Sequence, residues 1–355
     1  MADKDIMDPK GHQASSPAQM PRAAWKDIAK RTYKRTWDDN VGLVAAGVAF
    51  YGFFALLSLL GMIVLIYGFA ADPHMVISNM NGLTAILPGD VARLIGDQLM
   101  NAVTTSESKK GVALLIALAV ALYGGTNGAA AAITSLNIAY EEKEKRSLLV
   151  FYLTAFGMTV CAVLLALLML SATTAAAFLG RLVPHASGLA VAAGKVATDI
   201  ALVLVAAGVV STLYRFGPSR EDARWKWITP GSAFTAIAWL ILTLLFGFYV
   251  SHLTNYSATY GSLGAVVALL TWMYLSAYAF VFGAELNSEI EHQTAKDSTT
   301  GSPEPLGQRG AWAADNVATD DKVQDRPEET REGEKLTQAS PQVAEEDRSL
   351  PPRAD

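Results

Sequence analysis

The hydrophobic and polar positions of this chain separate into long blocks. Residues 41–291 are dominated by apolar runs, whereas residues 1–40 and 292–355 are polar and charged. A helix needs about 20 apolar residues, at about 1.5 Å per residue, to cross the hydrocarbon core of a bilayer. Six runs reach this length, at about residues 41–70, 111–139, 148–179, 188–214, 228–251 and 262–284. The pattern therefore predicts an all-α, polytopic membrane protein with six transmembrane helices that contact the lipid bilayer.

Lysine and arginine are concentrated in alternate links between these runs. They are dense in residues 22–35, in the link 140–147 and in the link 215–227, and they are sparse in the intervening links. Positively charged loops are retained in the cytoplasm during insertion. The alternation therefore predicts that both termini are cytoplasmic, and the even number of helices agrees with this orientation.

The first outer loop contains a further helical pattern. Apolar residues recur at helical spacing after Pro88, within the loop 71–110. This spacing is typical of an amphipathic helix. We expect one such helix to lie over the outer mouth of the bundle. It either simply covers a hydrophobic edge or forms part of the mouth of a transport path.

Both polar ends of the chain have a composition that is poor in apolar residues. Residues 1–21 and 292–355 cannot bury enough apolar surface to offset the entropy of ordering, so we expect a disordered N-terminal tail and a disordered cytoplasmic C-terminal tail. Residues 22–40 are basic and contain Trp25 and Trp37. This composition favours an interfacial segment that contacts anionic lipid headgroups.

The composition and the missing motifs argue against several kinds of functional site. The single cysteine, Cys161, excludes an internal disulfide and a cysteine-cluster metal site. The chain contains no HExxH pair, no phosphate-binding loop and no G-x-S-x-G elbow. The basic residues are explained by the membrane orientation, so nothing favours nucleic acid as a partner. We therefore expect no enzyme activity, no cofactor and no metal, and the sequence makes no prediction of an oligomeric state.

A few polar side chains lie inside the apolar runs. Tyr51 and Asn127 lie well within the first and second runs, and Tyr274 and Tyr278 share one face of the sixth. Glycine and alanine accompany them, as they do where membrane helices pack closely. These polar groups either bond between packed helices or line a polar cavity.

Glu285 follows the last apolar run. Residues 263–284 span about 33 Å as a helix, which places Glu285 at the cytoplasmic edge, where it can be ionised without a large burial cost. We expect Glu285 and Asn287 to tie this helix to a polar layer that also contains Asn137, with Arg215 as the preferred partner of Glu285. On this interpretation Glu285→Gln lowers stability, and Glu289 and Glu291 belong to the solvated tail.

Several motifs resemble the YihY/BrkB family of bacterial inner-membrane proteins. They are ITSLNIAYEEKEKRS after residue 132, YGSLGA from residue 260, and GAELN from residue 283. The resemblance covers about residues 25–291, and Ser58 departs from it because the family usually has proline there. The motif residues are Tyr260, Gly261, Gly264, Trp272 and Gly283. The resemblance implies six spans and an inner-membrane location. Some members carry a ribonuclease label, which these residues do not support, and a virulence label describes a phenotype.

Two functions from different classes fit these features. The first is transport or export of a small or amphiphilic, lipid-like envelope solute. The second is a membrane scaffold or envelope assembly factor that transports nothing. A transporter predicts a cavity lined by Tyr51, Asn127, Tyr274 and Tyr278, whereas a scaffold predicts that these groups are used in contacts between helices.

Overall fold

The computed structural model describes residues 10–70, 107–181, 188–252 and 263–318. Its elements belong to one compact unit, Met1–Asn316. In the described ranges the chain is helical, and the only strand-like feature is a single antiparallel bridge between Ala223 and Thr299. The all-α prediction is therefore confirmed. The amphipathic helix expected in the loop 71–110, and the motif residues Tyr260 and Gly261, lie outside the described residues.

Six long helices correspond to the six apolar runs. They are α2 (Val41–Ala70), α5 (Glu107–Ala139), α6 (Leu148–Arg181), α7 (Gly188–Phe216), α8 (Trp225–His252) and α10 (Gly264–His292). Four stretches of described residues are long and apolar enough to cross a membrane: Val41–Ser58, Leu148–Leu165, Trp225–Tyr249 and Val266–His292. Their outer faces are strongly apolar, with Leu43, Leu148 and Leu244 more than half exposed. The number of crossings and their direction remain predictions.

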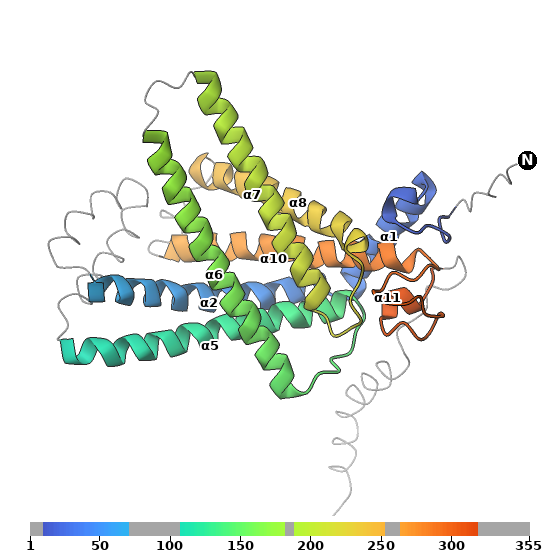
Figure 1. The fold of residues 1–355 in the computed structure, drawn as a ribbon, viewed down its shortest axis with the longest axis horizontal. Coiled ribbons are helices and arrows are strands. Elements are labelled where there is room, and N and C mark those ends of the chain that lie inside the picture. Colours follow the sequence, from blue (N-terminus) through green and yellow to red (C-terminus); the bar gives the residue numbers. More distant parts are fainter. Residues whose placement is uncertain (1–9, 71–106, 182–187, 253–262, 319–355) are drawn as a thin grey trace, which may run out of the picture. The chain divides into compact units, whose positions relative to one another are not determined.

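Small residues let two of these helices approach closely. α2 and α5 run side by side (Figure 1). A Cβ atom built on Gly124 would lie 3.0 Å from the Ser58 hydroxyl, and one built on Gly128 would lie 3.4 Å from the Ala55 Cβ. The glycines of α5 therefore pack against α2, as small residues do in membrane bundles.

α8 and α10 cross even more closely, at Gly231 and Gly283. A Cβ on Gly283 would lie 2.7 Å from the Tyr214 hydroxyl and would overlap Thr235. Pro230 lies inside α8, where its missing N–H interrupts the backbone ladder. Asn287 of α10 bridges this interruption, since it donates to the Ile228 carbonyl at 2.9 Å and accepts from the Gly231 N–H at 2.7 Å.

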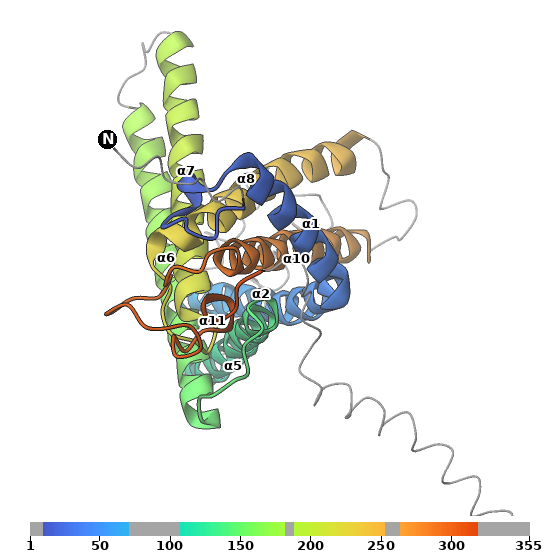
Figure 2. The ribbon, with the colours of Figure 1, turned by 90° about the vertical axis from the view of Figure 1, so that its right-hand side faces the viewer.

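A shorter helix, α1 (Arg22–Asp38), lies across the end of α10 (Figure 2). Its buried residues Ala24 and Ile28 pack against Trp227 and Ile290. Asn40 then adopts a positive φ of 50°, a conformation that asparagine tolerates, and the chain turns from α1 into α2.

The segments around α1 and the end of α10 form what we call the polar cap, residues 10–40, 137–147, 214–228 and 285–316. Its apolar base is a buried cluster that includes Val41, Leu136, Tyr140, Tyr214 and Ile228. The base joins the ends of five helices, so the cap is continuous with the bundle.

The cap contains residues that we expected to be disordered. Residues 293–316 are folded and include α11 (Trp312–Asp315), and residues 10–21 include a 3-10 helix, η1 (Pro17–Gln19). The two ends bond to each other, because Ala295 N–H donates to the His12 carbonyl at 2.8 Å. Arg309 is buried and donates to the carbonyls of Ala314 and Ala295, at 2.6 and 2.9 Å. The tail prediction is thus corrected for these residues, whose order comes from hydrogen bonds that composition does not reveal.

Candidate functional site

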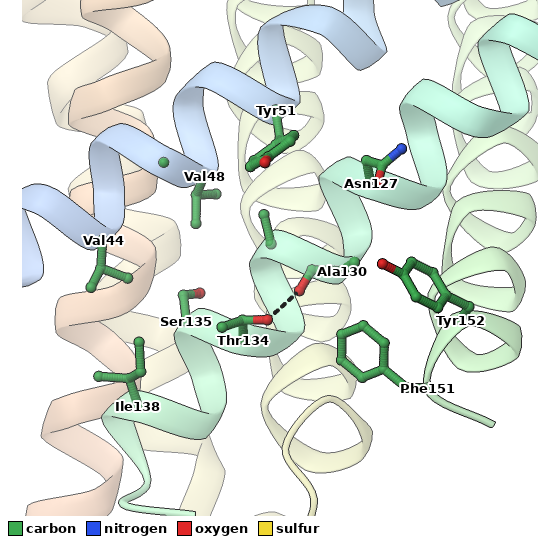
Figure 3. Close-up of a pocket in the computed structure, with 12 residues that line it drawn as sticks. Val44, Val48, Tyr51, Asn127, Ala130, Thr134, Ser135, Ile138, Phe151 and Tyr152 are labelled. Atoms are coloured by element: carbon green, nitrogen blue, oxygen red, sulfur yellow. Dashed lines mark hydrogen bonds between the residues drawn. The ribbon is translucent and has the colours of Figure 1, made fainter. Parts of the chain in front are cut away.

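A groove between α2, α5 and α6 is the first candidate site (Figure 3). Its volume is about 340 Å³. α2 contributes Val44, Gly47, Val48 and Tyr51; α5 contributes Asn127, Ala130, Ala131, Thr134, Ser135 and Ile138; and α6 contributes Phe151 and Tyr152. Tyr51 and Tyr152 are about half exposed, so the groove opens to the side of the bundle.

The polar groups of the groove are few and are set in apolar walls. The Thr134 hydroxyl donates a hydrogen bond to the Ala130 carbonyl of its own helix, at 2.9 Å (Figure 3). Asn127 likewise donates to the Tyr123 carbonyl, at 2.8 Å. Ser135 donates in the same way to the Ala132 carbonyl at 2.7 Å, so these bonds hold the side chains of α5 in place. The hydroxyls of Tyr51 and Tyr152 and the side-chain oxygen of Asn127 are further polar groups of the lining residues. An apolar groove with a few placed polar groups is typical of a site for an amphiphile.

The structure brings together only two of the four predicted cavity residues. Tyr51 and Asn127 both line the groove, from α2 and α5. Tyr274 and Tyr278 instead pack against the small residues Ala45 and Ala49 of α2, with their own rings 6.3 Å apart. Tyr278 also borders a separate apolar pocket of about 420 Å³ between α8 and α10.

Other motif residues serve helix contacts. Trp272 donates its indole N–H to the Thr243 hydroxyl at 3.2 Å, which joins α10 to α8. Gly283 lies at the close crossing of the same two helices. Gly264 is the first residue of α10. Asn287, which we expected in a polar layer, bonds to the α8 backbone.

Asn137 joins two links of the polar cap. Its oxygen accepts from the Ser219 N–H at 2.7 Å, and its nitrogen donates to Glu144 at 2.9 Å. Hydrogen bonds from the Arg146 guanidinium are the largest cause that lowers the pKa of Glu144 to about 2. Asn137 therefore connects the segments after α5 and α7 within the polar cap.

Glu285 occupies a different environment from the one we expected. It is only 1% exposed, and its Oε1 atom makes no hydrogen bond to any described residue. Arg215, the expected partner, instead lies 3.7 Å from Asp222 and stacks on Trp225 at 4.7 Å. α10 continues beyond Glu285, and α1 packs across it, so the carboxyl group is covered by protein.

Glu289 and Glu291 are buried as well, so their assignment to a solvated tail was wrong. Glu289 accepts from Arg31 Nε at 2.5 Å and lies 3.4 Å from Arg35 Nε. Glu291 accepts from Arg220 Nη2 at 2.6 Å, and both side chains are at least 98% buried. One signal was available in the sequence: Arg31 and Arg35 are four residues apart, as are Glu285 and Glu289, so each pair lies on one face of a helix.

Arg35 occupies the centre of this charge cluster. It bonds to Glu141 as well as lying near Glu289, and its guanidinium lies over the Trp312 ring at 5.3 Å. Arg35 therefore connects α1, the link after α5, α10 and α11. The second candidate site is this cluster, with the buried Glu285 beside it.

Comparisons with known proteins support the prediction that this chain is a membrane protein. Residues 32–306 match the model of the family described as virulence factor BrkB. The chain is 32% identical over 187 residues to ribonuclease-like protein YfkH of Bacillus subtilis (strain 168), which covers 52% of this chain and 68% of that relative. No solved structure matches.

Shorter matches link the chain to proteins named UPF0761 membrane protein. It is 30% identical over 86 residues to PSHAa0171 of Pseudoalteromonas translucida, which covers 24% of this chain and 28% of that protein. It is 35% identical over 78 residues to a relative from Xanthomonas campestris pv. campestris (strain 8004), which covers 22% of this chain and 18% of the relative. These alignments therefore span less than a third of each protein.

Proposed function

The chain belongs to the BrkB family of membrane proteins, and we propose that it binds a lipid-like amphiphile in the groove between α2, α5 and α6 and moves it across the bacterial inner membrane. The observation that carries this proposal is the groove itself, whose apolar walls bear the polar ends of Tyr51, Asn127 and Tyr152. Its volume of about 340 Å³ lies in the range of about 300–1,000 Å³ that is usual for sites of small molecules.

The direction of the groove supports an amphiphile as the ligand. Ile138 marks its end near the polar cap, and Asn127 lies 11 residues deeper along α5, or about 16 Å at helical rise. That is about half of the 30 Å hydrocarbon core. We place the cap in the cytoplasm, since its segments hold most of the arginines and lysines of the links. A headgroup would then enter from the cytoplasmic side, and its chains would remain in lipid.

Lipid movement in vesicles tests this function. The purified protein is reconstituted with a headgroup-labelled fluorescent phospholipid, and a reductant that cannot cross the membrane reports the outer-leaflet fraction. We expect wild type to speed exchange between leaflets, and Asn127→Leu to slow it several-fold because the deep polar group is lost. Tyr123→Phe is the control, because Tyr123 lies on the same helix, is 74% exposed and does not line the groove.

The opposite result would favour the scaffold function. If the folded wild-type protein moves neither this lipid nor a single-chain amphiphile, transport through the groove is rejected. An Asn127→Leu protein that is as active as Tyr123→Phe would reject the groove as the path.

We also propose that α1 rests on anionic lipid. Lys26, Lys30 and Lys34 are exposed and four residues apart, and Tyr33 and Trp37 beside them are 63% and 68% exposed. The opposite face of α1 is buried against the bundle. A helix that presents lysines and aromatic rings together fits the headgroup region of an anionic leaflet.

Thermal unfolding in nanodiscs tests the lipid contact. We expect the unfolding midpoint temperature of wild type to be higher in anionic than in zwitterionic lipid. Each lysine near an anionic surface contributes about 1 kcal/mol to the attraction. Replacing all three lysines by glutamine should remove that rise. Lys296→Gln, which removes an exposed lysine of the cap outside α1, should keep it. Equal midpoints for wild type in both lipids would rule out the contact.

A further inference from the structure

Glu285 differs from the other buried carboxylates of the polar cap. Glu289 and Glu291 are ion-paired to arginines at 2.5 and 2.6 Å. Glu285 is as deeply buried as they are, but its Oε1 atom lacks a hydrogen-bond donor within the part of the chain that the structure describes. A buried ionised carboxylate without a partner is costly, so this geometry needs an explanation.

The charges that surround Glu285 do not supply a partner. The buried Tyr140 phenol interacts with Glu285, and the charged groups that do so are Arg35 and Asp39 at the end of α1, Glu141 after α5, and Glu289 one turn later on α10. Three of these four groups are carboxylates, and Arg35 is already bonded to Glu141 and lies 3.4 Å from Glu289.

The other basic side chains nearby face Glu289 rather than Glu285. Arg31 bonds to Glu289 and to Gln293, the latter at 2.6 Å. His292 faces Glu289 at 3.5 Å. An ionised Glu285 would therefore be one more negative charge in a buried cluster whose cations are already in use, which is unfavourable in a low-dielectric interior.

We infer that Glu285 is a proton-binding site, and that its neutral acid holds the polar cap in the closed arrangement seen here. When the proton leaves to water, the new carboxylate competes with Glu141 and Glu289 for Arg35. Arg35 also covers the Trp312 ring at 5.3 Å. Its displacement would loosen both α1 and the segment that carries α11, so one proton controls how firmly the cap closes over the bundle.

This inference does not rest on the transport proposal. Its site lies in the polar cap, none of its groups lines the groove, and its readouts are a protonation state and a local opening.

Infrared spectroscopy of the reconstituted protein tests the protonation directly. At neutral pH we expect wild type to show the C=O stretching band of a buried carboxylic acid, which shifts in D₂O. The band should be lost in Glu285→Gln and retained in Glu304→Gln, which changes an exposed carboxylate of the cap. No such band in wild type, or a band unchanged in Glu285→Gln, would overturn the inference.

Hydrogen exchange tests the opening. In wild type, the infrared band should disappear over a certain pH range as Glu285 loses its proton. Over the same range, amide hydrogen exchange in α1 and around α11, corrected for the intrinsic rate, should increase. In Glu285→Gln, whose amide cannot release a proton, exchange should stay constant over the same range. If Glu285→Gln does not fold, the test compares the pH dependence of exchange in wild type with that in Glu285→Asp. Exchange in wild type that does not follow the band would reject the link between proton and cap.

Discussion

At the scale of single residues, the decisive feature is that three glutamates near the end of α10 have different surroundings. Glu289 and Glu291 are paired with arginines that lie 258 and 71 positions away in the sequence, and Glu285 is covered but unpaired. Hydropathy predicted that Glu285 lies just after the last apolar run. It could not reveal the burial that follows, because that burial depends on α1 packing across α10.

One consequence concerns substitution by glutamine. Because Glu285 is inferred to be a neutral acid, Glu285→Gln should be tolerated at neutral pH, in contrast to the loss of stability that its position in the sequence suggested. Glu291→Gln should behave differently, since it leaves Arg220 as an unpaired charge that is 98% buried.

We expect Glu291→Gln to lower the free energy of unfolding by about 3 kcal/mol, the cost of removing one partner of a buried ion pair. Denaturant unfolding in a fixed detergent measures it. Glu304→Gln is the control and should change stability by less than about 0.5 kcal/mol, because its side chain is exposed. A Glu291→Gln protein as stable as this control would mean that Arg220 finds another partner.

At the scale of elements, the helices themselves were predictable and their contacts were partly so. Apolar run length is a local property, and all six runs are helical over their described residues. The small residues of the second run also predicted close helix packing, but they did not identify α2 as the partner. The division of the four polar residues between the groove and the α2–α10 contact was not predictable, because it depends on which way each helix is turned in the bundle.

The crossing of α8 and α10 gives a prediction at this scale. Gly283→Ala places a methyl group against Thr235 and Tyr214, so we expect it to destabilise the protein by about 1–3 kcal/mol, the usual cost of overpacking. Gly208→Ala on α7 is the matched control, because a Cβ there meets no atom within 4 Å. Thermal unfolding in detergent compares the two. Equal midpoints would show that the crossing has room to relax.

At the scale of the whole described unit, residues 10–21 and 293–316 pack together as parts of one structure. The tail after α10 had the composition of a disordered segment, yet residues 293–316 fold because their backbone bonds to distant links. Arg224 N–H donates to the Ser298 carbonyl at 2.9 Å, and Trp312 N–H donates to Glu142 at 2.7 Å. Such partners lie far away in the sequence, so composition alone underestimates the order of the segment.

The bonds between Arg31 and Glu289, and between Ala295 and His12, also set an order of events during synthesis. The ribosome makes α1 before α10, so the charged face of α1 cannot meet its partners until the helices between them have been made. A nascent chain that stops before residue 289 therefore leaves Arg31 without this carboxylate, and the cap can close only after α10 has been made.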